Sequence, residues 1–480
     1  MWTSRLFFLV GCWIVILTLL QLVPFFTALA LEEGVAASSF FASMSVGLLV
    51  GGSLYMGFRS SERVRIRKLT ILLPLVGGVA LAFAAGLPFF FLLPDAGLIT
   101  AFYEGMSLIT TTGATAYDGS LSEMRSVQLW RSMAAWFGGF MAVCVSLSLL
   151  TALNSGGIQL HRSALPFGDS EKGYPRLKAT AVTLWPVYAL FTAICCLLLM
   201  LGGMPFDSAV MLSMASVSTT GITPDGGHVV AGFWPQLVVV VFTICAALSW
   251  DMHYARLKQL RFNIQFTLET RAFTLALASA AVVLFFLSDE GWMNALWGSI
   301  FASVSAVTTS GFASGDSHFS TELPLASAIV LMALVCLGGS VAGTSGGIKM
   351  LRGVILGMLG KAEVERLALP HGVRALRYEG QSVQPRDIEA VWLVLGGFVF
   401  VFVVGVLTLA IFGIRFQEAI ALALSSLALS GPMAFAIDPY FPGFTGMHDK
   451  DYIVLSILML VGRVEASLFL ALFAKSLWRG

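Results

Sequence analysis

Long runs of apolar residues follow one another along the chain, separated by short polar or glycine-rich segments. A helix needs about 20 apolar residues to cross roughly 30 Å of hydrocarbon. On that rule the pattern predicts ten membrane-spanning helices, over residues 6–30, 36–58, 69–93, 127–153, 178–203, 229–255, 270–288, 324–358, 388–413 and 451–477. The first run ends in Ala28-Leu29-Ala30, which resembles a secretory cleavage site, but the run is longer than a typical signal-peptide core. We therefore expect it to remain as a span.

Four shorter apolar stretches lie between spans, at residues 97–111, 206–219, 292–308 and 416–429, and they are too short to cross the bilayer. Each leads into a string of small or hydroxyl residues with one glycine: SLITTTGAT, ASVSTTGIT, SAVTTSGFA and SLALSGPMA. The glycines are Gly113, Gly221, Gly311 and Gly431, with spacings of 108, 90 and 120 residues. Repeats of that length are sizeable helical units. We therefore expect four units of helix, re-entrant loop and helix.

The composition supports a membrane protein: 57% of the residues are hydrophobic, 11% are charged, and the mean hydropathy is +0.87. The net charge of +1 says little about partners, and nothing suggests nucleic acid. The six histidines are scattered, and no nucleophile is paired with a base, so an enzyme is not expected. The six cysteines lack the spacing of a metal site and are interpreted as small buried side chains.

Most of the 28 Lys and Arg residues lie in the segments after the second, fourth, sixth and eighth spans and near the two ends of the chain. Cytoplasmic loops are enriched in these residues, so this distribution predicts that both termini are cytoplasmic. Acidic residues lie mainly on the opposite face, where the four strings open. An acidic rim would concentrate cations at the mouth of a pore, although the insertion rule alone also tolerates acids there.

Irregular backbone at membrane depth survives only inside protein or along a watery cavity, so the four strings are expected to meet around one axis. Rings of backbone carbonyls can replace the water around a cation, and glycine allows the positive φ that turns carbonyls inward. The candidate ion-binding residues are Thr111, Thr112, Gly113, Thr219, Thr220, Gly221, Thr309, Ser310, Gly311, Ser430 and Gly431. One such glycine is typical of a helix C-cap, but four at the same topological position favour a selectivity filter.

The segment CLGGSVAGTSGGIKMLR (336–352) interrupts the eighth span. Its candidate gating residues are Gly338, Gly339, Gly343, Gly346, Gly347 and Lys349. So many glycines predict a break in the helix, and broken spans line cavities in membrane proteins. We expect a loop beneath the filter, on its cytoplasmic side, that acts as a gate. A small-residue packing surface between helices is the alternative.

Arg463 lies twelve residues into the last span. At 1.5 Å per residue this is about 18 Å along a span of roughly 30 Å, which is near the midplane. An arginine there is costly next to lipid, so it is expected to face the protein interior. Two roles remain open: a local barrier along the permeation path, or a buried group that binds the carbonyls of a broken helix.

Several motifs resemble those of the Trk/Ktr/HKT superfamily of potassium transporters, and within it the bacterial Trk membrane subunits. They are FYEGMSLITTTGAT, LWRSMAAWFGG, VTTSGFA, GGSVAGTSGGIKMLR and GRVEASLFL, and the resemblance covers nearly the whole chain. It implies an all-α membrane protein with two extra N-terminal helices and four potassium-channel-like repeats (M1-P-M2) in a pseudo-fourfold arrangement. The implied units are residues 1–67 for the two helices, then 68–160, 161–262, 263–386 with a broken M2 helix, and 387–480.

The resemblance also implies potassium uptake across the bacterial cytoplasmic (inner) membrane, with potassium as substrate and no cofactor. The implied partners are a second copy in a homodimer and a cytoplasmic nucleotide-binding regulatory subunit, a TrkA-like ring. The family's filter glycines, gating loop and pore arginine fall on Gly113, Gly221, Gly311 and Gly431, on 338–349 and on Arg463. Glycine at 113 matches the potassium-preferring members.

The strings depart from the family pattern at Leu429, Met433, Ile222 and Pro224, so the sharpness of potassium over sodium selection is left open. Flow by a passive channel and by symport are both compatible with the sequence. An ion-coupled secondary carrier of a small solute is the alternative function, but it would need carboxylates inside its spans, whereas the acids lie mainly at the outer edge. A non-conducting sensor is supported only by the irregular fourth string.

Overall fold

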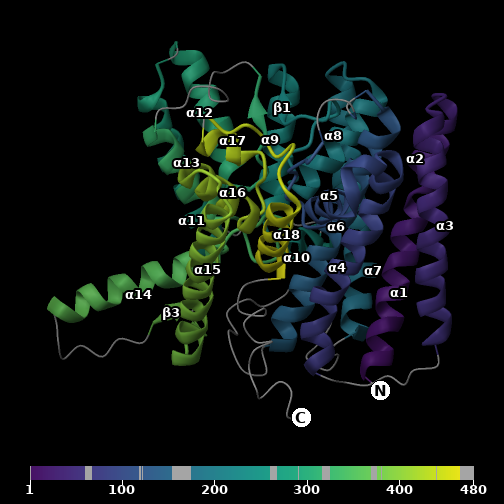
Figure 1. The fold of residues 1–480 in the computed structure, drawn as a ribbon. Coiled ribbons are helices and arrows are strands. Elements are labelled where there is room, and N and C mark those ends of the chain that lie inside the picture. Colours follow the sequence, from purple (N-terminus) through teal and green to yellow (C-terminus); the bar gives the residue numbers. More distant parts are fainter. Residues whose placement is uncertain are drawn as a thin grey trace.

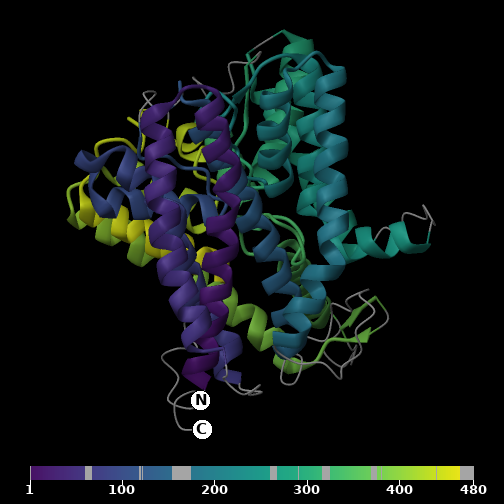
Figure 2. The same cartoon turned by 90° about the vertical axis from the view of Figure 1, so that its right-hand side faces the viewer.

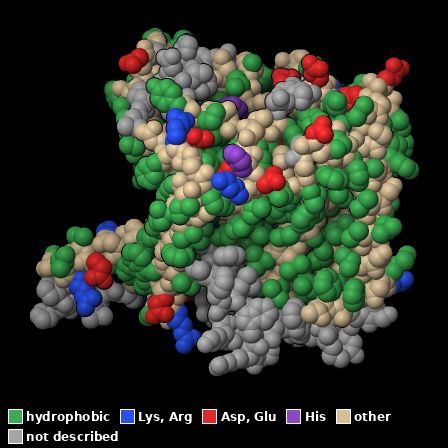
Figure 3. Space-filling model, in the orientation of Figure 1, with side chains coloured by type: hydrophobic (Ala, Val, Ile, Leu, Met, Phe, Trp, Pro, Cys, Tyr) green, Lys and Arg blue, Asp and Glu red, His purple; other side chains and the backbone are tan. Residues whose placement is uncertain are grey.

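The computed structural model describes residues 2–59, 67–117, 121, 123–153, 174–259, 267–289, 291–315, 325–368, 376–379, 381–438 and 440–464. Within these residues the protein is mostly helical, and most of the long helices stand side by side (Figure 1). Hydrophobic side chains cover the middle of the face in Figure 3, and most visible acidic side chains lie in its upper half. A band of this kind is the surface that a bilayer would cover.

The chain begins with two spans, α1 (Trp2–Leu20) with α2 (Leu22–Ala30) and then α3 (Gly34–Gly57), that pack against α4 (Arg67–Leu92), the first helix of the rest of the protein. Helices α1 and α2 together form one span, and it lies against α3 and α4 (Figure 2). Glycine permits this close packing, because a Cβ at Gly47 would lie 2.4 Å from the Thr18 hydroxyl and one at Gly77 would lie 2.4 Å from the Trp13 ring.

After these spans, the described part of the chain repeats one unit four times: a long helix, a short helix and a second long helix. The first long helices are α4, α7 (Tyr174–Leu201), α11 (Leu268–Leu287) and α15 (Pro385–Ile411). The short helices are α5 (Gly97–Ile109), α8 (Phe206–Ser218), α12 (Trp292–Val307) and α16 (Phe416–Leu427). The second long helices are α6 (Arg125–Leu153), the pair α9 (Phe233–Ala247) and α10 (Trp250–Gln259), the pair α13 (Leu325–Leu337) and α14 (Met350–Ala368), and α18 (Asp449–Val464). The predicted fold class is confirmed.

Among the described residues, six helices are long and apolar enough to cross a membrane, or seven if α9 and α10 count as one span. The sequence predicts ten. Helix α6 is long enough but carries buried polar residues such as Gln128 and Arg131, which it can do because the protein largely encloses it. The described part of α18 ends at Val464, and the rest of that predicted span lies outside the described residues.

The prediction of one continuous helix over 229–255 is wrong. The segment begins with the short strand β1 (Val229–Val230), and α10 is bent away from α9 by 96°. The bend occurs at Leu248, whose backbone is extended. Amides of the loop after α13 bind the carbonyls freed at the end of α9: Ser340 donates to Ala247 over 2.8 Å, and Thr344 to Ala246 over 3.0 Å. A partner distant in sequence therefore stabilises the break.

The predicted break in the eighth span is confirmed. Helix α13 ends at Leu337, and α14 begins at Met350 and extends away from the other helices (Figure 1). The remaining elements are short: η1 (Pro94–Ala96), β2 (Ala313–Ser314), β3 (Arg377–Tyr378), β4 (Gln381–Ser382) and α17 (Met433–Ile437). Strands β1 and β2 pair in parallel and connect the second and third units, whereas β3 and β4 form an antiparallel pair.

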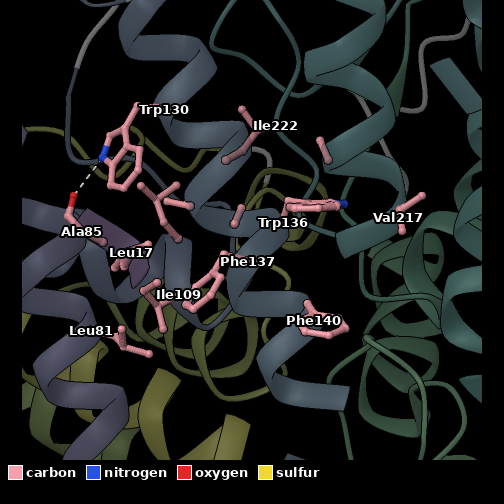
Figure 4. Packing of buried hydrophobic residues seen from close by; sticks show 14 of the residues in the cluster. Leu17, Leu81, Ala85, Ile109, Trp130, Trp136, Phe137, Phe140, Val217 and Ile222 are labelled. Carbon is pink, nitrogen blue, oxygen red and sulfur yellow. Dashed lines mark hydrogen bonds between the residues drawn. The ribbon is translucent and has the colours of Figure 1, made fainter. Parts of the chain in front are cut away.

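The largest buried cluster joins the N-terminal helices to the first and second units (Figure 4). Trp130 of α6 is fully buried, and its indole Nε1 donates to the Ala85 carbonyl of α4 over 3.0 Å. Glu33, just before α3, accepts hydrogen bonds from the amides of Arg125 (2.8 Å) and Ser126 (3.2 Å) at the start of α6. The carboxylate thus satisfies two amides that the helix leaves unpaired, and it fixes the added helices to the first unit.

Candidate ion-conducting site

The short helices α5, α8, α12 and α16 end in the same backbone structure. Within two residues of the end of each helix, a single residue has a left-handed backbone: φ is 59° at Thr111, 54° at Thr219, 54° at Thr309 and 61° at Leu429. The next amide donates to a carbonyl five residues back, from Thr112 to Ser107 (2.8 Å), Thr220 to Ala215 (3.0 Å), Ser310 to Ser305 (3.0 Å) and Ser430 to Ser425 (2.8 Å). These bonds define a Schellman motif. Each string therefore leaves its helix in the same direction relative to the helix axis.

Sequence reasoning missed this left-handed position, which lies two residues before each glycine. Threonine and leucine rarely adopt positive φ, so their residue types give no signal for it. Only the alignment of the four strings with one another could have indicated a shared backbone there. Strained positions of this kind persist where the surrounding structure determines them, and they cluster at functional sites.

Three of the four candidate filter glycines have the positive φ that the sequence predicts: 76° at Gly113, 78° at Gly221 and 75° at Gly311. The expectation is wrong for Gly431, which is not in this region. There the chain turns at once through Pro432 into α17, and the Gly431 amide donates to the Thr112 carbonyl over 2.7 Å. One candidate ion ligand, the Thr112 carbonyl, therefore already accepts a hydrogen bond from the fourth string.

The four strings adjoin one another in a closed cycle. A Cβ added at Gly113 would lie 1.9 Å from the Thr220 carbonyl oxygen of the second string, and one at Gly221 would lie 1.9 Å from that of Ser310 in the third. A Cβ at Gly311 would lie 3.0 Å from the Pro432 ring of the fourth string, and one at Gly431 would lie 2.6 Å from the Ala114 amide of the first. Each glycine thus makes room for the next string, and the cycle returns to its start.

Hydroxyl groups tie the first three strings to their own helices. The paired hydroxyls are Thr110 with Thr112 (2.8 Å), Ser218 with Thr220 (2.6 Å) and Thr308 with Ser310 (3.2 Å). The fourth string has Ala428 in place of the first hydroxyl, and the Ser430 hydroxyl has no hydrogen-bond partner among the described residues. The fourth string is therefore the one held least by side chains.

The loop at 338–349 packs against the break between α9 and α10. Besides the two bonds to the end of α9, the Trp250 amide donates to the Ala342 carbonyl over 3.3 Å. A Cβ at Gly343 would lie 2.4 Å from the Ala247 carbonyl oxygen, and one at Gly338 would lie 2.2 Å from that of Gly346. The Lys349 ammonium donates to the Ser345 carbonyl within the same loop. Glycine is required at these points because backbone meets backbone directly.

The same loop touches the ends of the short helices. The Gly346 amide donates to the Thr309 hydroxyl over 2.7 Å, and the Thr219 hydroxyl donates to that of Thr344 over 3.3 Å. A Cβ at Gly346 would lie 2.0 Å from the Ala428 carbonyl oxygen. The loop therefore contacts the second, third and fourth units at the base of their strings. The remaining gating candidates, Gly339 and Gly347, pack against Ser345 and Val335.

Arg463 connects this loop to the first unit. Its Nη1 donates to the Thr344 carbonyl over 2.9 Å, and its Nε donates to the Thr110 carbonyl over 3.0 Å. Its Nη2 donates to the Thr110 carbonyl and to the Thr111 hydroxyl. All three side-chain nitrogens thus bind oxygens of the protein. The arginine faces the interior, as the sequence predicts.

Sequence reasoning also missed a buried ion pair beside the strings. Glu104 of α5 and Arg131 of α6 are joined over 3.0 Å, with 0% and 4% of their side chains exposed. The signal was an acid inside an apolar helix and a basic residue inside a predicted span, both within the motifs quoted above. Intramembrane ionisable residues are functional candidates by default.

The oxygens at the strings are carbonyls and hydroxyls. Within the part of the chain that the structure describes, no group of three His, Cys, Asp or Glu side chains is arranged to hold a metal ion. Neutral oxygens in a ring suit a monovalent cation that must enter and also leave. This geometry, enclosed by long apolar helices, defines a multi-pass membrane protein that transports cations.

The TrkH family, described as cation transport proteins, matches residues 79–479, so the chain belongs to this family. It is 28% identical over 481 residues to the Trk system potassium uptake protein TrkH of Salmonella typhimurium, with 98% of each chain covered. It is also 28% identical over 391 residues to the Trk system potassium uptake protein TrkG of Escherichia coli K12, with 79% of each covered. The crystal structure of the potassium transporter TrkH from Vibrio parahaemolyticus aligns over all of both chains, with a TM-score of 0.88 and 25% identity. The protein is a transporter and not an enzyme.

Proposed function

We propose that the chain takes up potassium across the bacterial cytoplasmic membrane through a gated filter of backbone carbonyls. The proposed filter consists of Thr111, Thr112, Gly113, Thr219, Thr220, Gly221, Thr309, Ser310, Gly311, Ser430 and Gly431. The observation that carries the proposal is the closed cycle in which each string fills the space beside the glycine of the preceding one. The names of the relatives, which are potassium uptake proteins, support potassium as the ion.

The chemistry of the strings suits a cation that sheds its water. Carbonyl oxygens replace the hydration shell, and the four strings carry no carboxylate that would hold the ion too tightly. The C-terminal ends of α5, α8, α12 and α16 carry partial negative charge, and all four lead into the strings. This charge favours cations over anions at the centre of the cycle.

We assign the gate to the loop residues Gly338, Gly339, Gly343, Gly346, Gly347 and Lys349. Support comes from the contacts of this loop with the base of the second, third and fourth strings. To open, the loop must leave the carbonyls of Ala246 and Ala247 and the hydroxyl of Thr309. These are a few individual hydrogen bonds, each contributing about 1 kcal/mol, so binding of a regulator could supply the required free energy.

Of the two roles left open for Arg463, the geometry favours that of a tie between carbonyls. Its nitrogens bind Thr110 and Thr111 of the first unit and Thr344 of the loop. An arginine engaged in this way holds the loop against the filter, so it belongs to the closed gate. Opening releases the bond to Thr344 and changes the charge that passing ions meet.

The topology and partners remain proposals. The distribution of Lys and Arg favours cytoplasmic termini and a basic cytoplasmic face on which a nucleotide-binding regulatory subunit docks. Parts of these basic segments, at 60–66, 154–173, 260–266 and 369–375, lie outside the described residues. We retain the homodimer and the unit boundaries 1–67, 68–160, 161–262, 263–386 and 387–480, of which two boundaries also lie outside the described residues.

An ion-coupled carrier needs a buried carboxylate that can load and release its coupling ion. The buried carboxylate beside the first string, Glu104, is already bound by Arg131 and by the Ala116 amide. A committed carboxylate of this kind supports a filter more than a carrier site.

The proposal is tested by rubidium uptake into liposomes that contain the purified protein, with potassium and sodium as competitors. We expect uptake that potassium suppresses at far lower concentration than sodium does. Liposomes without protein and liposomes with Gly221→Val, which crowds the strings, serve as controls. Equal competition by the two ions, or uptake no greater than that of empty liposomes, would overturn the proposed function.

A further inference from the structure

The ion pair of Glu104 and Arg131 is an unusual feature of one repeat. Glu104 lies nine residues before Gly113, and the residues at the same spacing before the other three filter glycines are Leu212, Ala302 and Leu422. All three are buried apolar side chains. The short helix therefore packs in three units without any charge at this position. Its packing alone does not require an ion pair.

The pair is connected to the segments that follow the first two strings. Glu104 accepts a hydrogen bond from the Ala116 amide, three residues after Gly113, over 3.1 Å. Arg131 donates to the Gly226 carbonyl, five residues after Gly221, over 3.4 Å. Arg131 also donates to Gln128 over 3.1 Å. One ion pair thus contacts the segments after both strings.

A third connection extends the network. Gln128 donates to the Leu121 carbonyl over 3.0 Å, so the segment after the first string is bound near both of its ends. A buried ion pair is costly to desolvate, and apolar residues of similar volume often replace one without loss of stability. The retained charge therefore needs a reason other than the fold, and its hydrogen bonds indicate one.

We propose that Glu104 and Arg131 are positioning residues that fix the distance between the first and second strings, and thereby sharpen the choice between potassium and sodium. This inference rests on the proposed function of the strings. The carboxylate holds the segment after the first string through the Ala116 amide, and the Nη1 of the guanidinium donates to both Gln128 and Gly226. A filter selects by the number and placement of its oxygens, so a string free to shift accepts an ion of another size.

The decisive variant is the double substitution Glu104→Leu and Arg131→Met, which gives the first unit the apolar character of the others. We expect it to fold with a thermal midpoint near that of the unchanged protein and to transport rubidium. Its preference for potassium over sodium as competitor should fall about tenfold, the equivalent of one charge-assisted hydrogen bond. The matched control is Arg415→Gln with Glu418→Gln. It removes a partly exposed ion pair, joined over 3.2 Å, that does not belong to this network, and it should leave the preference unchanged.

Each outcome decides the question. If the unchanged protein transports rubidium and the double variant keeps the same ion preference, the positioning role is wrong while the proposed function stands. If the unchanged protein transports no rubidium, the proposed function itself fails. If the double variant does not fold, Arg131→Lys decides instead. Lysine keeps the charge beside Glu104 but lacks a second nitrogen in place of Nη1, which donates to both Gln128 and Gly226, so the preference should fall, and an unchanged preference would overturn the inference.

Discussion

Gly113→Ser is the substitution that tests the proposed filter most directly. The backbone at Gly113 has a φ of 76°, which costs a non-glycine residue about 1–2 kcal/mol. A Cβ there would also lie 1.9 Å from the Thr220 carbonyl oxygen, whereas contacts below 3.0 Å are essentially never made by real Cβ atoms. The first and second strings must therefore separate by about 1 Å. Functional sites tolerate displacements of about 0.5 Å, so a separation of this size moves the oxygens of the two strings out of the positions that the proposed filter needs.

We expect this separation to admit more sodium relative to potassium. The assay is rubidium uptake into proteoliposomes, with the concentrations of sodium and potassium that halve the uptake compared between variants. A displacement of about 1 Å in a positioned site can cost about a hundredfold, which sets the upper limit of the change in preference.

Gly203→Ser is the matched control. Gly203 also has a positive φ, of 89°, but nothing lies within 4 Å of its Cβ position. It therefore carries the same kind of backbone strain without the crowding, and its ion preference should match that of the unchanged protein. The reasoning fails if Gly113→Ser keeps the original preference, or if Gly203→Ser changes it equally.

Three further changes test other parts of the protein. Arg463→Met removes the hydrogen bond to the Thr344 carbonyl and should raise rubidium flux about tenfold or more, because a hydrogen bond to a charged group contributes about 1.5–3 kcal/mol. A fall in flux would contradict a role of Arg463 in the closed gate. Gly343→Ala puts a Cβ 2.4 Å from a carbonyl oxygen of α9 and should raise rubidium flux by displacing the loop. Gly357→Ala, with open space around its Cβ position, is the control and should leave the flux unchanged; equal fluxes through the two variants would count against a gate. Glu33→Ala removes the hydrogen bonds from two amides and from the Ser126 hydroxyl at the start of α6. It should cost about 1 kcal/mol of stability, seen as a lower thermal midpoint with unchanged ion preference; an unaltered midpoint would refute the capping role.

The short helices could be predicted closely because the local sequence determines where each of them begins and ends. The stretch 97–111 became α5 over Gly97–Ile109, and 206–219 became α8 over Phe206–Ser218. In each case the apolar run is too short to cross a bilayer and ends in small polar residues. The break in the eighth span was equally local, because five glycines between Leu337 and Met350 cannot continue a helix.

The bend at Leu248 could not be predicted in the same way. Apolar residues continue up to Leu248 and polar residues alternate with them after it, but no glycine or proline marks a break in the helix. The break is stable because Ser340 and Thr344, more than ninety residues later, donate to carbonyls that the helix leaves free. The left-handed backbone at Thr111 and its counterparts was hidden for a different reason: it is the C-cap position of a Schellman motif, which glycine usually marks, whereas threonine and leucine give no signal for it.

These contacts make the first string the most constrained of the four. On one side the fourth string donates from Gly431 to the Thr112 carbonyl, and on the other the Glu104 and Arg131 pair joins the segment after the first string to that after the second. Arg463 binds its base through Thr110. The fourth string has fewer such ties, since its Ser430 hydroxyl has no partner among the described residues. A change in the first string therefore cannot relax locally and must alter the carbonyls of the proposed filter, whereas the fourth can tolerate residues that depart from the pattern of the others.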